Sequence, residues 1–282
     1  MFDREAIQQL SEAEAISAAQ VAVDNAIGEN ALHAIAALPA HFTVHDLEQR
    51  LPLRRRARGT MTTSRLEDFA AYAAAHLEDG AITFVHADQM QAVAVLNLGT
   101  PAKPGHADNL AIFKPATTAA YDAIKAIESA PNAQRQHTQT KLAEWLEDWA
   151  ECITCFDADA QAIDLRKAIA AVRAITIESA RKAESVEGQL SSERSAFESV
   201  KATARTPLPA FVHVSCEPYA GLKKREFVLR LAVYPDDKGV NLGLRMARAE
   251  WHREEMALEL ASLVRGALAA SMQVALGTYV AK

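Results

Sequence analysis

Residues 211–248 read FVHVSCEPYAGLKKREFVLRLAVYPDDKGVNLGLRMAR, and they carry the clearest strand pattern in the chain. Three segments in this stretch alternate between apolar and polar residues or run apolar: Phe211–Cys216, Phe227–Tyr234 and Val240–Arg248. Turn residues separate these segments at Pro218–Gly221 and Pro235–Gly239. This pattern is typical of antiparallel strands that bury one face. The stretch therefore predicts a three-stranded antiparallel meander.

Helices and shorter strands are predicted on both sides of the meander. One helix has a distinct start, because Ser64 and Glu67 have the spacing of a capping box. The strongest amphipathic pattern recurs at i, i+3, i+4, i+7 and i+11, at Leu142, Trp145, Leu146, Trp149 and Ile153. Other helices are predicted over residues 3–26, 66–77, 118–128, 163–172 and 250–273, and other strands over residues 82–85, 93–98 and 111–114.

The predicted elements follow one another in mixed groups, without the regular strand–helix–strand alternation of a doubly wound sheet. We therefore expect an α+β fold with mixed, largely antiparallel sheets and packed amphipathic helices. We divide the chain into an N-terminal helix (1–30), an α+β region (31–158) and a C-terminal region (159–282), unless the last two form one continuous domain. Residues 174–205 fit either a long helix or a hairpin that turns near Gly188.

Composition argues against a membrane protein. Of the 282 residues, 50% are apolar and 23% are charged, and no apolar run approaches the roughly 20 residues that span a bilayer. The N-terminus carries acids and no apolar leader segment, and the three cysteines supply no disulfide framework. We therefore expect a cytoplasmic protein that does not contact a membrane.

Two basic clusters occur on a chain whose formal net charge is -6. In a strand, alternate arginines of the first cluster would form a row of charges about 6.8 Å apart, close to the phosphate spacing of a single strand. Nucleic acid, single-stranded or duplex, is therefore a candidate partner. The alternative is a solvated edge strand, whose charges prevent aggregation. The first cluster is Arg54, Arg55, Arg56 and Arg58. The second is Lys223, Lys224 and Arg225.

The most site-like polar loop is Pro104–Asp108, which contains an H-x-D pair. Such a pair can bind a metal or act as a base with its orienting group, and His86 and Asp88 repeat the spacing. Pro, Gly and Asp are also ordinary turn residues. His106 and Asp108 are therefore weak catalytic candidates.

Other chemical signatures are weaker still. Cys152 and Cys155 form a lone C-x-x-C without the second pair of ligands that a zinc site needs. Phosphate-binding glycine loops, nucleophile elbows and paired catalytic carboxylates do not occur in the sequence. We expect no metal and no cofactor, and the sequence does not indicate an enzyme.

Short signatures spread along the chain carry a resemblance to a known family. They are Gly59–Ser64, Phe69–Tyr72, Asn97–Pro101, Pro104–Asp108, Trp145–Trp149 and Cys216–Leu222. Together they resemble the YfdQ-like family of phage and prophage proteins, whose function is unknown. The resemblance covers most of residues 40–270. It implies a phage accessory protein that is expressed in an infected or lysogenic bacterial cell.

The leading hypothesis is a non-enzymatic, homo-oligomeric phage accessory protein that acts in DNA metabolism or host takeover. The homo-oligomer is inferred from the alanine-rich amphipathic helices at both ends of the chain. One alternative is a protein-binding inhibitor of a host or defence factor. Another is a nucleotide- or metal-dependent hydrolase that uses His106 and Asp108.

Overall fold

The computed structural model describes residues 4–26, 52–53, 56–128, 137–175, 208–236, 239–270 and 272–280. The chain forms two compact units, residues 1–56 and residues 57–282. In the first unit, α1 (Arg4–Ala26) confirms the helix predicted over residues 3–26, and the side chains described on it are mostly exposed. Most of residues 174–205, for which a long helix and a hairpin were alternatives, lies outside the described residues.

The second unit has the α+β fold that the sequence predicts. Five of its strands form a mixed sheet in the order β1-β6-β3-β2-β13. The predicted hairpin of β2 and β3 is confirmed, whereas β1 pairs with β6, and β13 with β2, in parallel. The bounds are β1 Gly59–Thr63, β2 Ile82–His86, β3 Gln91–Val95, β6 Asn109–Phe113 and β13 Gln273–Leu276. A small hairpin of β4 (Gly99–Thr100) and β5 (Lys103–Pro104) lies between β3 and β6 in the chain.

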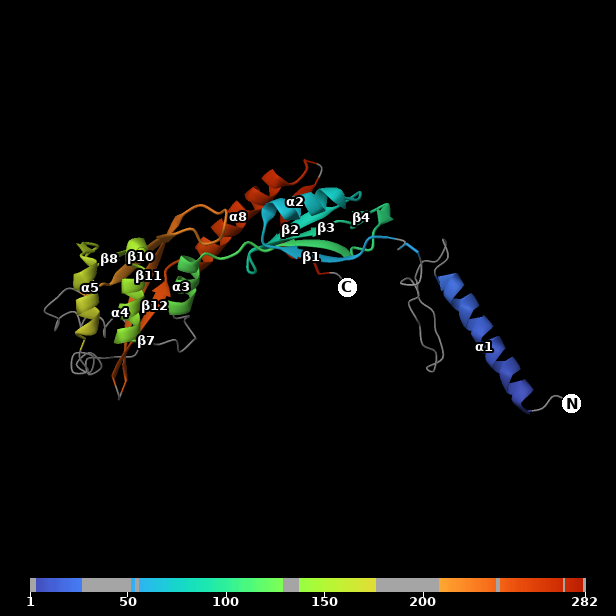
Figure 1. The fold of residues 1–282 in the computed structure, drawn as a ribbon, viewed down its shortest axis with the longest axis horizontal. Helices are drawn as coiled ribbons and strands as arrows, with labels where there is room; N and C mark the ends of the chain where they lie inside the picture. Colours follow the sequence, from blue (N-terminus) through green and yellow to red (C-terminus); the bar gives the residue numbers. More distant parts are fainter. Residues whose placement is uncertain are drawn as a thin grey trace. The chain divides into compact units, whose positions relative to one another are not determined.

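Two helices cover one face of this five-stranded sheet, α2 (Leu66–Ala75) and α8 (Ala249–Ala267) (Figure 1). Phe69 of α2 packs on Phe113 of β6, with ring centroids 5.8 Å apart, and both side chains are buried. The small side chain of Ala111, also fully buried, faces the same helices from β6. The core of this half of the unit therefore lies between the sheet and α2 and α8.

Six further strands form an antiparallel sheet in the order β7-β12-β11-β10-β8-β9. Its centre is the predicted meander, because β10 pairs with β11 and β11 with β12. The bounds are β7 His137–Thr138, β8 Ile153–Phe156, β9 Ala162–Ile163, β10 Phe211–Cys216, β11 Arg225–Asp236 and β12 Gly239–Met246.

One face of the six-stranded sheet is covered by α3 (Ala119–Ile127), α4 (Gln139–Asp148) and α5 (Leu165–Arg173) (Figure 1). Tyr121 of α3 packs on Phe227 of β11 at a centroid distance of 5.2 Å. The N-terminal part of α8 joins the same core, since His252 also contacts Phe227, at 4.9 Å. The alternating side chains of the other face point away from these helices.

Three predicted boundaries were wrong. The capping box does not form, because α2 has Arg65 as its N-cap without a side-chain cap, and Thr63 Oγ1 instead accepts a hydrogen bond from the Arg65 N–H. The stripe from Leu142 does not continue to Ile153, since α4 ends at Asp148 and Ile153 begins β8. The last helix ends at Ala267, and residues 273–276 form β13.

Each sheet of the second unit contains strands from distant parts of the chain. Residue 158, at which we divided the chain, lies between β8 and β9, which pair in one sheet. β13, near the end of the chain, completes the sheet that begins with β1. Residues 57–282 thus share one compact unit.

Candidate nucleic-acid interface

The His106–Asp108 loop is held by an amide and carboxylate network. Asn97 Nδ2 donates to Asp108 Oδ1 at 2.8 Å, and the Asn109 N–H donates to Asn97 Oδ1 at 2.9 Å. Asp108 therefore fixes the approach of the loop to β6, while His106 is exposed to solvent. These contacts give Asp108 a structural role.

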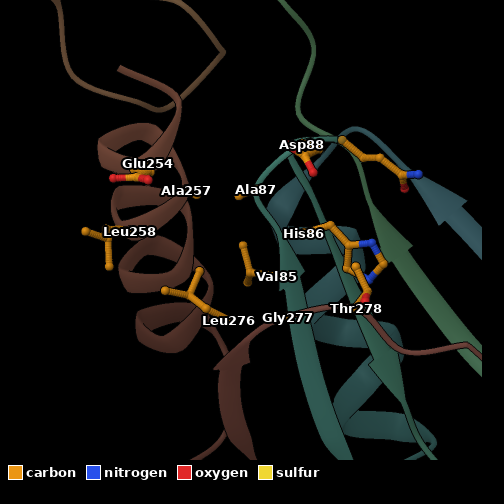
Figure 2. A pocket seen from close by; sticks show the side chains of 11 residues that line it. Val85, His86, Ala87, Asp88, Glu254, Ala257, Leu258, Leu276, Gly277 and Thr278 are labelled. Atoms are coloured by element: carbon orange, nitrogen blue, oxygen red, sulfur yellow. The ribbon is translucent and has the colours of Figure 1, made fainter. Parts of the chain in front are cut away.

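The second H-x-D pair borders a pocket of about 530 Å³ between α8, β2 and β13. Figure 2 shows Leu276 between α8 and Val85, Leu258 on the side of α8 that is farther from Val85, and His86 on the opposite side of β2. Asp88 is 85% exposed and pairs with Arg253 at 3.0 Å. His86 Nε2 is buried and has no hydrogen-bond partner among the residues that the structure describes. His86 is the last residue of β2, whereas Asp88 lies in the turn that follows and pairs with α8, so the two side chains of the H-x-D pair do not act on one group.

The described part of the first arginine cluster, Arg56 and Arg58, precedes a strand. Arg54 and Arg55 are outside the described residues, and β1 begins at Gly59, after Arg56 and Arg58. The described part of the cluster therefore lacks the extended strand on which the predicted row of charges depends. Contact of these arginines with nucleic acid stays a prediction.

The members of the second basic cluster differ in exposure and in their contacts. The Arg225 side chain is only 15% exposed, and its guanidinium forms an ion pair with Glu259 of α8, with Glu255 a further 3.9 Å contact. The Lys223 N–H also donates to Glu259 Oε1, at 2.6 Å. Arg225 therefore anchors β11 to α8, whereas the Lys223 and Lys224 side chains are exposed.

A different set of aromatic and basic side chains meets on the outer face of the six-stranded sheet, the face turned away from α3, α4 and α5. Phe211 of β10 lies directly opposite Phe156 of β8 on one side and Arg230 of β11 on the other. Arg230 in turn lies opposite Arg245 of β12. Because directly opposed residues of antiparallel strands point to the same face, these four side chains form one row across four strands.

Ring contacts tie this row to its neighbours. The Arg230 guanidinium lies over the Phe211 ring, 5.5 Å from its centroid. The Phe156 ring contacts the His213 imidazole at a centroid distance of 4.4 Å. His213 Nδ1 is 3.3 Å from Glu226 Oε1. We call Phe156, Phe211, His213, Arg230 and Arg245 the aromatic–arginine face.

The charges on this face are unbalanced. Arg230 and Arg245 are both exposed, and among the described residues neither guanidinium has a carboxylate partner. Like charges directly opposite on a sheet destabilise it by a fraction of a kcal/mol up to about 1 kcal/mol. Glu226, four residues before Arg230 on β11, contacts His213. The arginine pair therefore presents two positive charges to solvent beside two half-buried phenyl rings.

The sequence carried a signal for this face that the search for charge runs missed. In Phe211–Cys216 the buried residues alternate with half-buried ones, so Phe211 and His213 belong to the outward positions. Outward positions of a one-sided sheet are normally polar. An outward phenylalanine was therefore visible in the sequence, but its position beside Phe156 and Arg230 depends on strand register.

The cysteines are free thiols in the core of the six-stranded sheet or at its edge. Burial raises the pKa of the Cys155 thiol to about 12 and that of Cys216 to about 11, which favours the protonated forms. Within the described ranges, no group of three or more His, Cys, Asp or Glu side chains could hold a metal ion.

Comparison with known proteins identifies a family but no activity. Residues 3–279 match DUF2303, a family described as an uncharacterized conserved protein. The chain belongs to this family. No curated protein and no solved structure matches the chain. In the part of the chain that the structure describes, no helix is long and apolar enough to cross a membrane.

Proposed function

We propose that this protein is a non-enzymatic accessory protein that binds nucleic acid through the aromatic–arginine face. The observation that carries the proposal is the opposed pair Arg230 and Arg245, exposed and without carboxylate partners in the described residues. Arginine is the side chain best suited to phosphate, because its planar guanidinium donates two parallel hydrogen bonds. Such contacts release counterions and bind nucleic acid whatever its sequence.

The biological setting of the proposal rests on the resemblance to phage and prophage proteins. We place the protein in the cytoplasm of an infected or lysogenic bacterium, where a nucleic-acid-binding protein would act in phage DNA metabolism or host takeover. The overall charge of -6 favours a local binding face over a surface that coats nucleic acid throughout.

The proposal includes a homo-oligomer formed through the outer face of the five-stranded sheet. On that face Ile82, Phe84, Leu110 and Ile112 are half-buried, uncharged side chains, and Val93 and Val95 between them are already buried within the single chain. An uncharged apolar face suits a second copy of itself, since an isologous contact places the same residues opposite one another without charge repulsion.

The test is the affinity for fluorescein-labelled oligonucleotides, measured by anisotropy across a salt series. For a single strand, the slope of log K against log salt should fall by about 1.4 in the Arg230→Gln/Arg245→Gln variant, because each phosphate contact contributes about 0.7. Arg166→Gln, an exposed arginine on α5, is the matched control and should leave the slope unchanged. Absence of binding at low salt would refute the proposal and favour a protein partner.

A further inference from the structure

We infer that the aromatic–arginine face binds an extended single strand of nucleic acid, with two bases stacked on Phe156 and Phe211 and the backbone at Arg230 and Arg245. This inference rests on the proposed function and specifies its ligand. Single-stranded DNA and single-stranded RNA share the chemistry that the face recognises, which is a flat aromatic base joined to a phosphate.

The two phenyl rings favour bases as the ligand. Phe156 and Phe211 are only half-buried on the face turned away from the helices, and they are direct cross-strand neighbours. Each residue keeps part of its surface accessible to solvent, so a planar base that stacks on the ring removes apolar surface from both partners. Stacking of this kind accepts every base, because each has a π-face.

The order of the residues along the row separates the base site from the phosphate site. Neighbouring strands are about 4.8 Å apart, so the row from Phe156 to Arg245 spans roughly 14 Å across three strand spacings. The rings occupy one end of the row and the two guanidinium groups the other. The Arg230 guanidinium lies over the Phe211 ring in the free protein, so a base that stacks on that side of the ring displaces it toward the adjacent phosphate, which the long arginine side chain can reach.

Duplex nucleic acid cannot use this arrangement fully. In a duplex each base is stacked on both faces by its neighbours, so no base is free for Phe156 or Phe211. The major groove of a duplex is wide enough for a two-stranded β-ribbon of a protein. The row lies across the interior strands of a six-stranded sheet, which is too wide to enter that groove. A duplex would therefore contact the arginines alone and bind more weakly.

Polar side chains beside the rings complete the surface. Thr154 of β8 lies opposite His213, and Ser215 lies opposite Glu226, on the same outer face. Hydroxyl and imidazole groups donate and accept hydrogen bonds at base edges. These groups supply contacts for bases that stack on the rings, and they require the unpaired edges of a single strand.

The experiment compares fluorescein-labelled oligomers of twelve nucleotides, dT12 and U12, with a twelve-base-pair duplex, using the full chain. Phe156→Leu and Phe211→Leu keep an apolar side chain of similar size and remove the aromatic ring. Each should weaken dT12 binding about tenfold, as expected for the loss of one stacked base. Phe211→Tyr should retain binding, and Trp251→Leu, which removes an exposed ring on α8, should change nothing. Circular dichroism of each variant confirms the fold.

The outcomes separate the inference from the proposed function. Binding of dT12 at least tenfold tighter than duplex, lost in both leucine variants, supports the inference, and tighter binding of U12 than dT12 assigns RNA as the source. Salt-dependent binding that needs the arginines but is equal for duplex and for the leucine variants overturns the inference and leaves the proposed function standing. No binding to any oligomer overturns both.

Discussion

Gly105 shows how closely the loop after β3 is packed against its own backbone. A Cβ at Gly105 would lie 2.0 Å from the Asn97 carbonyl oxygen and 2.8 Å from the Leu98 carbonyl carbon. The Gly105 N–H also donates to the Leu98 carbonyl oxygen at 2.8 Å, so the two segments cannot separate without losing that bond. The close approach, and not a catalytic role, explains a glycine beside His106.

Replacement of Gly105 should therefore destabilise the protein. We expect Gly105→Ala to lower the free energy of unfolding by about 2 kcal/mol, since overpacking against backbone costs about 1–3 kcal/mol. The matched control is Gly266→Ala in α8, where an added Cβ meets nothing within 4 Å and alanine favours the helix by about 0.5–1 kcal/mol. Urea unfolding of both variants measures the difference, and equal stability of the two would contradict the packing argument.

At the level of helices and strands, the sequence pattern predicted the elements that depend on neighbouring residues in the chain. The meander of β10, β11 and β12 was predicted because alternation and turn residues are properties of consecutive residues. β13 was not, because four residues near the end of the chain become a strand only by pairing in parallel with β2. Nothing within residues 273–276 indicates that distant partner.

The same holds for the candidate site: runs of basic residues can be found in the sequence, but contacts between distant residues cannot. Arginine runs are visible in the sequence, yet Arg225 proves to be an ion-pair partner of α8. Arg230 and Arg245 are separated by the turn of a hairpin and become neighbours only through its register. Phe156 joins them from another part of the chain. Register, which the sequence pattern leaves open, thus decides which charges meet.

The ion pair between β11 and α8 gives a prediction for this scale. Glu259→Gln removes the main partner of a guanidinium that is only 15% exposed, and breaking a buried pair from one side is more costly than losing an exposed one. We expect the free energy of unfolding to fall by about 2 kcal/mol in urea denaturation. Glu254→Gln, an exposed acid on the same helix, should change it by less than about 0.5 kcal/mol. A similar effect of both changes would show that Arg225 does not anchor α8.

At the scale of the whole molecule, the two sheets leave outer faces of opposite character. The six-stranded sheet presents arginines and aromatic rings, and the five-stranded sheet presents an aliphatic face of half-buried Ile82 from β2 and Leu110 and Ile112 from β6, with Val93 and Val95 of β3 buried between them. Phe84, which lies beside the aliphatic side chains on the same face, is covered from within the chain, because Tyr279 stacks on it at a ring-centroid distance of 5.4 Å. A face that joins copies and a face that binds nucleic acid can therefore act at the same time.

The proposed homo-oligomer gives the last prediction. The parent protein should elute as a dimer in size-exclusion chromatography with light scattering, and Ile112→Lys should elute as a monomer, because an isologous contact would bury two unpaired ammonium groups. Leu258→Lys, which places the same charge on an exposed position of α8, should remain dimeric.

Loss of the dimer should also weaken binding to long single strands more than to dT12, since two linked faces bind one strand with a raised effective concentration. A monomeric parent would remove the role of the aliphatic face in self-association, and the binding measurements on dT12 would be unaffected by that result.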